Sequence, residues 1–465
     1  MSGVSVESLT TWLAEDGHLV DRVAVIGAPL AREINGACID SRLVRPGDLF
    51  VALPGERTDG HEFVDHAVQS GAVCALVAAD RLAQLRPNVF GSVRLVPVDD
   101  TLAALQSLSL RWRRLFPELV RIGITGSNGK TTTKEMIAAI LSLVAPTVSS
   151  RGNYNSDIGL PVELLRVRAE HQYGVFEMGM NRPGEIALLA GLVEPDIGLI
   201  TNIGCAHVGM VGTEHDVALE KRAIFSRFTG EQIAVVPAGD RYADLLAGDV
   251  DGHVVRYDMQ SAGVSRVEPR GLDGSRLHCV EGPIDLKLPG GPMVTNAIAA
   301  MTVVRQLDVP FERIRDGLEQ LRPVFGRLEI IRGDLTLIRD CYNANPESMR
   351  PALDLLAGSA TRGRRVAVLG AMKELGEHSA EAHRELVRYV DELDLDEVWL
   401  VGDEFVAIKE SGLARGARVF GYDQWDELVA AAGDLGPGDV VLLKGSRALS
   451  LERLTPVVMK SEETP

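Results

Sequence analysis

The sequence predicts an α/β protein of three domains, and three observations lead to this prediction. The chain has 465 residues, enough for several separate hydrophobic cores. From about residue 101, short apolar runs alternate with segments of helical periodicity, a pattern typical of parallel sheets with crossover helices. This series ends near Pro323, and a second series of the same kind follows. We therefore expect domains at residues 1–100, 101–322 and 323–465.

The first of these regions contains short strands and many turns. It includes Asp-Ser-Arg at 40–42, the run Pro-Gly-Asp-Leu-Phe-Val-Ala-Leu at 46–53, and a helix that should end near Gly71. Short elements separated by turn residues predict a small α/β domain.

The central region predicts a mostly parallel sheet. Its expected strands are residues 121–125, 173–177, 197–202 and 232–237. After the first of them, apolar residues recur at i, i+3 and i+4 from Met136 to Val144, and Pro146 lies just beyond. We expect this apolar stripe to be buried and to anchor the loop that precedes the helix.

The third region predicts a second, Rossmann-like α/β domain. Its expected strands are residues 335–340, 365–370, 397–402, 418–422 and 439–444. Each run ends near Gly, Asp, Asn or Lys, as expected where strand ends open onto the crevice of an open sheet. The region has Gly370 and Gly376 but no Gly-x-Gly-x-x-Gly, so no dinucleotide site is predicted.

Composition indicates a globular protein of a reducing compartment. Hydrophobic residues make up 46% of the chain and aromatic residues 5%, which suits ordinary α/β cores. A formal charge of −17 argues against general binding to nucleic acid or membranes, although local Arg and Lys can still hold an anionic substrate. The five cysteines lack the paired spacing of a disulfide framework or zinc site. With no leader-like start and no long apolar run, we expect a cytoplasmic location.

The most informative motif is Thr-Gly-Ser-Asn-Gly-Lys-Thr-Thr-Thr at 125–133, at the expected junction of strand and helix. Glycine permits a positive φ and close approach of the backbone, so that successive N–H groups can point at phosphate oxygens. Lys130 supplies a mobile positive charge and Thr131 a hydroxyl for a metal ion. Ile124 stands where the longer, commoner pattern begins with glycine. The sequence therefore predicts a phosphate-binding loop of the shorter form.

Three polar residues beyond the loop are candidates for the chemistry. Glu177 ends an expected strand, where an acid commonly faces the metal of a bound nucleotide; the alternative is a solvated strand end. His207 follows the next strand and could coordinate a second cation, although a single His is more often structural. Lys221 lies in a helix expected at 214–228, where lysine usually faces solvent, and spacing alone gives it no role.

Several ordered motifs resemble those of the Mur ligase family. They are TGSNGKTTTKEM, RGNYNSDIGLP, FEMGMNRPGEI, TNIGCAHVGMVGT, LEKRAIF, DCYNANPESM, GAMKELG and LLKGSR. The resemblance runs from about residue 38 to 452. Tyr-Asn-Ala-Asn-Pro at 342–346 and Glu-Leu-Gly at 374–376 are most similar to the branch that adds D-alanyl-D-alanine to a UDP-linked tripeptide.

The resemblance implies an ATP site in the central domain and two Mg²⁺ ions. The residues implied for the nucleotide are Gly126, Ser127, Asn128, Gly129, Lys130, Thr131, Thr132, Asn296 (adenine), Arg327 (a phosphate), Asp340 (ribose), Tyr342, Asn343 and Asn345. Those implied for the metals are Thr131 and Glu177 for one ion, with His207 and Lys221 for the second. In this family the lysine at the position of Lys221 is carbamylated by carbon dioxide. An anionic carbamate, unlike an ammonium group, is a reasonable neighbour for a magnesium ion.

The resemblance also implies substrate-binding residues in all three domains. They are Ser41, Arg42, Asp59, Gly60 and His61 in a UDP-sugar-binding N-terminal domain, Asn153 and Asn155 for the peptide carboxylate, and Lys444, Ser446 and Arg447 in a C-terminal domain for the amino substrate and closure. The expected partners are UDP-N-acetylmuramoyl-tripeptide and D-alanyl-D-alanine. Neither nucleic acid nor membrane insertion is expected, and the expected state is a monomer.

The implied activity is an ATP-dependent carboxylate–amine ligation in peptidoglycan synthesis, and hence in cell wall biogenesis, cell shape and division. It would proceed through an acyl phosphate and form the UDP-linked pentapeptide. Lys130, Glu177, His207 and Lys221 are the implied catalytic residues. The alternatives are a Mur-type or folylpolyglutamate-type ligase with another amine donor and, in a different class, a nucleotide-dependent switch or noncatalytic partner subunit.

Some positions depart from the family's pattern. Pro292 lies in the segment before Asn296 where His-Asn-Val is frequent, and Arg339 stands where Asp often precedes Asp340. Ala371 replaces a common acid, and Ser156 replaces a frequent Asn. These departures affect the expected fine contacts of the site and leave the expected reaction class unchanged.

Overall fold

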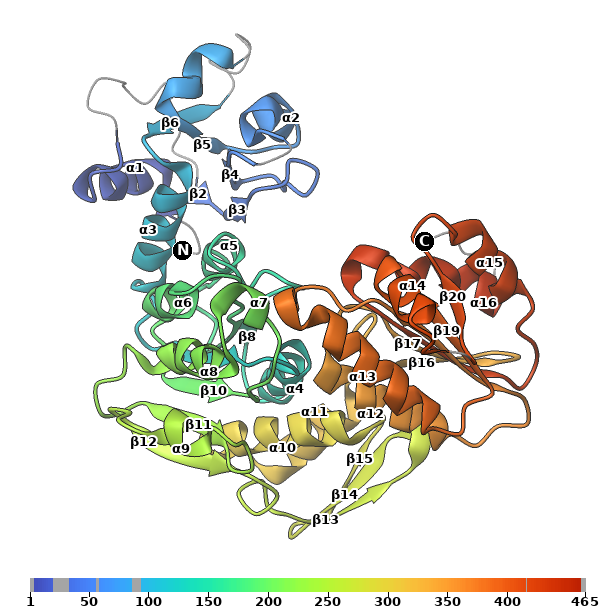
Figure 1. The fold of residues 1–465 in the computed structure, drawn as a ribbon. Helices are drawn as coiled ribbons and strands as arrows, with labels where there is room; N and C mark the ends of the chain where they lie inside the picture. Colours follow the sequence, from blue (N-terminus) through green and yellow to red (C-terminus); the bar gives the residue numbers. More distant parts are fainter. Residues whose placement is uncertain (1–3, 20–32, 56–57, 86–92, 415, 461–465) are drawn as a thin grey trace.

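The computed structural model describes residues 4–19, 33–55, 58–85, 93–414 and 416–460. Figure 1 shows three α/β lobes, with the N-terminal lobe in blue above a central lobe in green and yellow and the C-terminal lobe in orange and red beside it. The predicted α/β class with several parallel sheets is confirmed. The domain boundaries at 100/101 and 322/323 remain a prediction.

The N-terminal lobe is built on a parallel sheet in the order β3-β4-β5-β6. Its strands are β3 (Gly36–Cys38), β4 (Asp48–Val51), β5 (Cys74–Ala78) and β6 (Arg94–Val98), and a short antiparallel pair joins β1 (Val4–Ser5) to β2 (Glu33–Ile34). The helices are α1 (Val6–Glu15), the 3-10 helix η1 (Gly60–Phe63), α2 (Val64–Gln69) and α3 (Thr101–Arg113).

Helix α3 connects the N-terminal and central lobes. It packs against α1 on one side and α5 (Gly159–Leu164) on the other, and Trp112 donates from Nε1 to the carbonyl of Val167 at 3.0 Å. One apolar core accordingly runs from Leu9 through α3 to Leu164. The two lobes therefore share a packed interface.

The central sheet is parallel, in the order β12-β11-β10-β7-β9-β8. Its strands are β7 (Val120–Thr125), β8 (Thr147–Ser149), β9 (Tyr173–Glu177), β10 (Ile197–Ile200), β11 (Ile233–Pro237) and β12 (His253–Tyr257). The helices are α4 (Lys130–Ser142), α5, α6 (Glu185–Val193), α7 (Val208–Val211), α8 (Glu214–Arg222) with the 3-10 turn η4 (Ala223–Phe225), α9 (Ala243–Ala247), α10 (Gly291–Arg305) and α11 (Phe311–Gln320).

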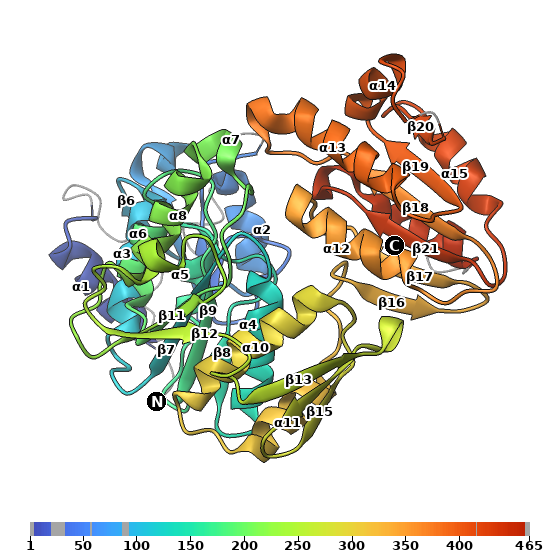
Figure 2. The ribbon, with the colours of Figure 1, turned by 60° about the horizontal axis from the view of Figure 1, so that its bottom comes forward.

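Helices cover both faces of this sheet, as expected for parallel strands. On one face α4 and α10 pack over residues such as Ile122 and Ile124, and on the other α6 and α8 pack over Phe176 and Ile200. A small antiparallel sheet of β13 (Val264–Pro269), β14 (Ser275–Cys279) and β15 (Pro283–Leu286) lies against α11. Figure 2 shows this sheet below α10.

The stripe predicted on α4 is buried except at its end. Met136, Ile137, Ile140 and Leu141 are fully buried, but Val144 is 43% exposed. Its inclusion was wrong, because α4 ends at Ser142 and the chain has already turned toward β8. The remaining stripe holds the loop before α4 against the core.

The C-terminal sheet has the order β16-β17-β21-β18-β19-β20, with β16 antiparallel to β17 and the others parallel. Its strands are β16 (Glu329–Arg332), β17 (Thr336–Asp340), β18 (Arg365–Gly370), β19 (Glu397–Val401), β20 (Arg418–Phe420) and β21 (Val440–Lys444). The helices are α12 (Pro346–Ala357), the 3-10 helix η6 (Gly376–His378), α13 (Ser379–Asp391), α14 (Asp403–Glu410), α15 (Trp425–Gly433) and α16 (Thr455–Met459).

The position of β21 between β17 and β18 makes a switch point in this sheet, where ligand crevices commonly form. In Figure 2, α12 lies on the side of the C-terminal lobe that faces the central lobe. The loops after β17 and β18 therefore meet the phosphate-loop end of the central sheet. Among the described helices, none is both long and apolar enough to cross a membrane.

The contact of α11 with α4 gives a stability prediction. A Cβ on Gly317 of α11 would lie 2.7 Å from the Cα of Ile140, so neither helix backbone can relax easily. We expect Gly317→Ala to lower the free energy of unfolding by about 1–3 kcal/mol, measured by denaturant titration. The matched control is Gly433→Ala at the end of α15, where the added Cβ meets open space and the change should be neutral or slightly stabilising. Equal stability of the two variants would contradict the packing.

Candidate active site

The phosphate loop has a backbone that demands glycine at two positions. Gly126 has φ +147° and Gly129 has φ +82°, and a Cβ would collide with Thr201 at the first and Asn296 at the second. The loop is held by Asn202, which accepts from the N–H of Ser127 through its carbonyl at 3.0 Å and from the N–H of Asn128 through Oδ1 at 2.9 Å. Since α4 begins immediately afterwards, its N-terminus faces the same space as the loop.

Lys130 folds back over this loop. Its Nζ donates to the carbonyl of Gly126 at 2.7 Å and to that of Ser127 at 3.3 Å. Desolvation lowers the pKa of Lys130, the charge of Arg327 adds to this effect, and the charges of Glu177 and Glu374 oppose it. Carbonyl oxygens are a weak substitute for an anion, so this ammonium group is suited to phosphate.

Glu177 is buried at the end of β9, with 2% of its surface exposed. Its Oε1 accepts from Nδ2 of Asn155 at 2.7 Å, while its backbone N–H donates to Oγ of Ser150 at 3.0 Å. Its Oε2 has no hydrogen-bond partner in the described parts of the chain. The alternative of a solvated strand end is therefore wrong, and this oxygen calls for a cation or donor.

His207 lies in the left-handed region at φ +69°, directly before α7. Its Nδ1 is buried without a hydrogen-bond partner among the described residues, and Oε2 of Glu374 is 3.5 Å away. Burial lowers the pKa of His207 to about 3, with repulsion from Lys130 and Lys221 adding to the effect. The imidazole is therefore neutral near pH 7, the form that can bind a metal ion.

Lys221 is buried near the end of α8, with 1% of its surface exposed. In the described ranges its ammonium group has no hydrogen bond or ion pair. Burial lowers the pKa of Lys221 well below the ordinary value, and the charge of Lys130 adds to the shift. The expectation of a solvated helix face is wrong, because α8 turns this residue toward the interior.

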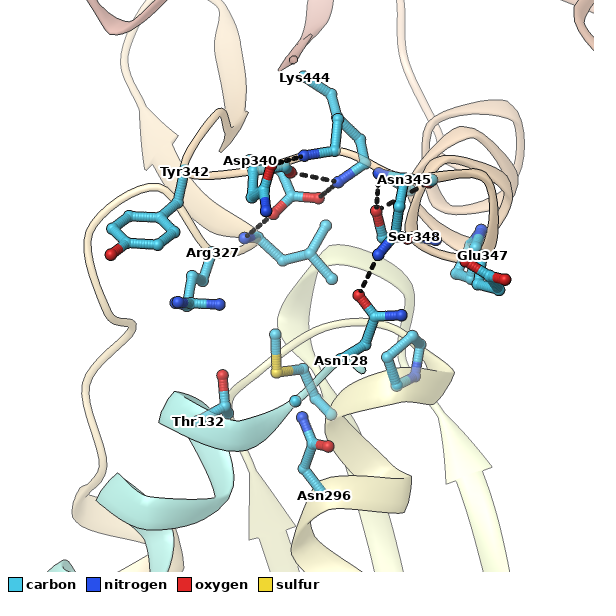
Figure 3. Close-up of a pocket in the computed structure, with 18 of the residues that line it drawn as sticks. Asn128, Thr132, Asn296, Arg327, Asp340, Tyr342, Asn345, Glu347, Ser348 and Lys444 are labelled. Carbon is cyan, nitrogen blue, oxygen red and sulfur yellow. Dashed lines mark hydrogen bonds and ion pairs between the residues drawn. The ribbon is translucent and has the colours of Figure 1, made fainter. Parts of the chain in front are cut away.

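A cavity of about 370 Å³ lies between the central and C-terminal lobes (Figure 3). The predicted nucleotide residues that line it are Asn128, Gly129, Thr132, Asn296, Arg327, Asp340, Tyr342, Asn343 and Asn345. Nδ2 of Asn345 donates to Oδ1 of Asn128 at 2.8 Å, and Nη2 of Arg327 donates to the hydroxyl of Thr131 at 2.9 Å. The guanidinium of Arg327 also stacks 4.2 Å from the ring centre of Tyr342. Both lobes thus contribute polar side chains to one space.

None of Lys130, Glu177, His207 and Lys221 is among the residues that line this cavity, although Gly129 and Thr132, on either side of Lys130 and Thr131, are. The effects of these four polar residues on one another's pKa place their charges in one neighbourhood. Among the residues that the structure describes, no group of three or more His, Cys, Asp or Glu side chains is arranged to hold a metal ion.

The predicted C-terminal substrate residues occupy three different settings. Lys444 is buried in the cavity, where Nζ pairs with Oδ2 of Asp340 at 2.6 Å. Ser446 is also buried, and its Oγ accepts from the backbone N–H of Lys373 at 2.8 Å. Arg447 is exposed and pairs with Glu452. Lys444 therefore lies with the nucleotide residues, and Ser446 supports a neighbouring loop.

The predicted N-terminal substrate residues are engaged within their own lobe. Arg42 pairs with Asp40, beside the buried Ser41. His61 uses both ring nitrogens, since Nε2 accepts from the N–H of Ala78 at 2.8 Å and Nδ1 lies 2.6 Å from Oδ1 of Asp59. The N–H of Gly60 donates to the carbonyl of Leu53 at 2.9 Å.

A second cavity of about 300 Å³ lies between the N-terminal lobe and the segment before α5. It is lined by Asn35, Gly36, Ala37, Cys38, Leu43, Arg45, Asp48, Arg151, Gly152, Tyr154, Val162 and Arg166. None of Ser41, Arg42, Asp59, Gly60 and His61 is among these residues, and Asn153 is exposed beside it. Arg45, Arg151 and Arg166 at this cavity were not singled out from the sequence.

Other contributors were also missed. Lys134, fully buried in α4, donates to the carbonyl of Ser150 at 2.5 Å and so fixes the residue that supports Glu177. Thr201 donates to the carbonyl of Asn128 at 2.6 Å. Glu374 was read only as part of a motif, although it reaches His207. For these residues the sequence offered one signal, which was the presence of Lys134 in the expected amphipathic helix that follows the loop.

Two of the departures noted in the sequence have clear structural settings. Pro292 lies in the first turn of α10, where its missing N–H is no loss, and it lines the nucleotide cavity. Arg339 pairs with Glu329 of β16 at 2.8 Å.

Comparison with known proteins places the chain among a recognised group. Family models match three consecutive parts: "Mur ligase family, catalytic domain" at 33–113, "Mur ligase middle domain" at 124–304 and "Mur ligase, glutamate ligase domain" at 326–447. A curated UDP-N-acetylmuramoyl-tripeptide–D-alanyl-D-alanine ligase of Treponema pallidum (strain Nichols) is 42% identical over 95% of this chain and 97% of its own.

Solved structures agree with that match. MurF from Acinetobacter baumannii superposes with a TM-score of 0.82 and 32% identity over 99% of both chains. MurF ligase from Thermotoga maritima in complex with ADP gives a TM-score of 0.74 and 29% identity over 92% of this chain and 97% of that one. The resemblance seen in the ordered motifs is confirmed along nearly the whole length, and the chain belongs to the Mur ligase family.

Proposed function

We propose that this ATP-dependent ligase joins D-alanyl-D-alanine to UDP-N-acetylmuramoyl-tripeptide and forms the UDP-linked pentapeptide of peptidoglycan synthesis. The observation that carries the proposal is the phosphate loop beside a cavity that both lobes line. Near this loop lie the partly buried Lys130 and His207 and the buried Glu177 and Lys221, whose polar groups are incompletely paired. The relatives named for this reaction match the chain over nearly its whole length, which favours this amine donor over another.

ATP would lie in the cavity between the central and C-terminal lobes. The N–H groups from Gly126 to Thr131 would receive its phosphates, and Lys130 would exchange two carbonyl contacts for phosphate oxygens. Arg327 would exchange the hydroxyl of Thr131 for a phosphate. Asn296 would face the adenine and Asp340 the ribose, with Tyr342, Asn343 and Asn345 bordering the nucleotide.

The residues present fit the two magnesium ions that the family implies. Thr131 and Glu177 would hold one ion, and the unpartnered Oε2 of Glu177 supports this assignment. His207 and a modified Lys221 would hold the second, supported by the unpartnered Nδ1 of the neutral imidazole. Bound Mg²⁺ supplies positive charge that lets two anionic reactants approach each other.

Lys221 is suited to carbamylation. Carbon dioxide reacts with a neutral amine, and burial of this side chain favours the neutral form. An unmodified ammonium group would repel a divalent ion, whereas a carbamate offers it an anionic oxygen. The absence of an ion-pair partner for Lys221 in the described ranges leaves room for this modification.

In the first step, the tripeptide carboxylate would attack the γ-phosphate of ATP and form an acyl phosphate with release of ADP. Lys130 and Arg327 would hold the phosphate oxygens, while Asn155, which already contacts Glu177, and Asn153 would orient the carboxylate. The dipeptide amine would then attack the acyl carbon, and phosphate would leave. Closure about residues 321–326 would exclude water from the acyl phosphate.

The remaining assignments complete the proposal. Ser41, Arg42, Asp59, Gly60 and His61 would shape the UDP-sugar side of the N-terminal lobe, where the internal contacts of His61 hold the segment in place. Lys444, through Asp340, and Ser446, through the loop at Lys373, would organise the C-terminal side, with Arg447 at its rim. We propose a cytoplasmic monomer.

The reaction predicts strict dependence on the amine. Purified enzyme with ATP, Mg²⁺ and UDP-N-acetylmuramoyl-tripeptide should release phosphate continuously only when D-alanyl-D-alanine is added. Coupled phosphate detection measures this, with L-alanine, D-glutamate and L-glutamate as comparison donors. Release that is independent of D-alanyl-D-alanine, or faster with another donor, would contradict the assignment and favour a related ligase or a nucleotide-dependent switch.

Carbamylation of Lys221 predicts a rescue experiment. Lys221→Ala should lower kcat by about 100-fold or more, and short carboxylic acids such as acetate should restore part of the activity by supplying the missing anionic ligand. The matched control is Lys287→Ala, an exposed lysine of the same lobe, which should keep full activity. Full activity of Lys221→Ala without any added acid would reject the carbamate.

A further inference from the structure

The loop between β18 and η6 reaches from the C-terminal lobe to the central lobe. Gly376, the first residue of η6, lies against Gly209 of α7, where a Cβ on Gly209 would come within 2.7 Å of the Gly376 nitrogen. Figure 1 shows α7, in green, beside the orange segment that precedes α13, and η6 contacts α7. This contact of two backbones fixes the distance between the loop and His207, which immediately precedes α7.

Glu374 is the residue that this loop presents to the catalytic cluster. Its Oε2 lies 3.5 Å from Nδ1 of His207. Its negative charge partly offsets the lowering of the pKa of Lys130 that burial causes. The distance of 3.5 Å to His207 is longer than the range of about 2.7–3.2 Å that is usual for an N–H···O hydrogen bond. No hydrogen bond to the Glu374 side chain is found within the described ranges, and 49% of that side chain is exposed. The carboxylate is therefore accessible, and among the described residues no Lys or Arg side chain pairs with it.

The backbone holds Glu374 in a costly conformation. It has φ +67°, in the left-handed region that a residue with a Cβ seldom adopts. Non-glycine residues in that region cluster at functional sites, where the surrounding structure enforces them. A glycine would adopt this backbone conformation without strain. The turn itself therefore does not explain why a glutamate occupies the position, and a role of its carboxylate does.

The residues around Glu374 are fixed by contacts to three other segments. The N–H of Met372 donates to Nε2 of the buried His383 at 2.9 Å, and the N–H of Lys373 donates to Oγ of Ser446 at 2.8 Å. Nζ of Lys373 pairs with Glu404 at 2.5 Å. The loop is therefore preorganised, and the position of Glu374 does not depend on a bound ligand.

The charge pattern indicates what this carboxylate would bind. Lys130, Lys221 and Arg327 suit phosphate and carboxylate groups, and these belong to the triphosphate and the acceptor. Of the three substrates proposed above, the dipeptide is the one whose amino nitrogen must reach the acyl phosphate. A tripeptide that ends in diaminopimelate, as in the acceptor named for a ligase of Acinetobacter baumannii, also carries an amino group, so the KM values for the dipeptide and the tripeptide must be compared. Glu177 is buried on the phosphate side, whereas Glu374 lies on the C-terminal lobe and remains accessible.

We propose that Glu374 binds the ammonium group of the incoming amine substrate and so directs its nitrogen toward the acyl phosphate. This inference rests on the proposed function and assigns a specificity-determining residue to the same site. Glu374 acts by charge complementarity, and the first step of the reaction, which involves no amine, does not need it.

The test compares Glu374→Gln with the wild-type enzyme. The variant should raise KM for D-alanyl-D-alanine by about 10- to 100-fold, as expected when a charged hydrogen bond is lost. KM for ATP and for the UDP-tripeptide should stay within about twofold. Acyl phosphate formed without the amine, trapped by borohydride reduction, should be unchanged. The matched control is Glu377→Gln, an exposed glutamate three residues further along, which should behave as wild type.

A second variant guards against a merely structural effect. Glu374→Gly suits the backbone, so it should keep the melting temperature of the wild type and still show the raised KM for the dipeptide. An unchanged KM for the dipeptide in both variants would overturn the proposal, as would a loss of acyl phosphate formation in Glu374→Gln. Failure of the proposed function would look different, because the wild-type enzyme itself would then ignore D-alanyl-D-alanine.

Discussion

The central feature of the structure is a group of charged side chains that folding buries, wholly or in part, without giving each of them a full set of partners. Lys130 has only loop carbonyls, Lys221 has no ion pair in the described ranges, and one oxygen of Glu177 is unpartnered. Each such group costs roughly 1–3 kcal/mol or more of unfolding free energy. Phosphate oxygens and divalent cations would satisfy all of them together. The fold thus maintains a costly electrostatic arrangement, which the proposed binding of ATP with divalent cations would relieve.

Several polar contacts between the central and C-terminal lobes use side chains that line the nucleotide cavity. Asn345 bonds to Asn128, Arg327 bonds to Thr131, and Glu347 accepts from the N–H of Cys205 at 2.7 Å. The neutral bond between Asn345 and Asn128 contributes about 0.5–1.5 kcal/mol, whereas the bonds of Arg327 and Glu347 involve a charged group and contribute about 1.5–3 kcal/mol each. ATP in the cavity would compete with the bonds of Asn345 and Arg327, and such competition would couple nucleotide binding to the relative position of the lobes.

Much of the sheet framework could be predicted from the sequence. Strands β9 and β18 have the expected bounds, and the other expected strands differ by one or two residues at an end. The buried parallel strands were visible as continuous apolar runs. The antiparallel sheet of β13, β14 and β15 was missed because exposed polar residues interrupt its apolar positions. The three-residue strand β8 was too short to give a pattern.

Site residues could be predicted where the local sequence determines their geometry. They could not be predicted where tertiary packing determines it. The phosphate loop could be predicted because its backbone requires positive φ at two positions, and glycine marks both of them in the sequence. The burial of Lys221 could not, because a lysine in a helix faces solvent or interior according to what packs against it. Arg45, Arg151 and Arg166 meet at one cavity although two lobes supply them, so no local spacing could reveal them.

The most direct measurement of the central claim is hydrogen–deuterium exchange with and without a non-hydrolysable ATP analogue and Mg²⁺. If one site spans both lobes, exchange should slow together in the loop at 126–131 and in the C-terminal segments at 326–328 and 342–345. Protection confined to one lobe, or absent from the phosphate loop, would contradict a shared nucleotide site.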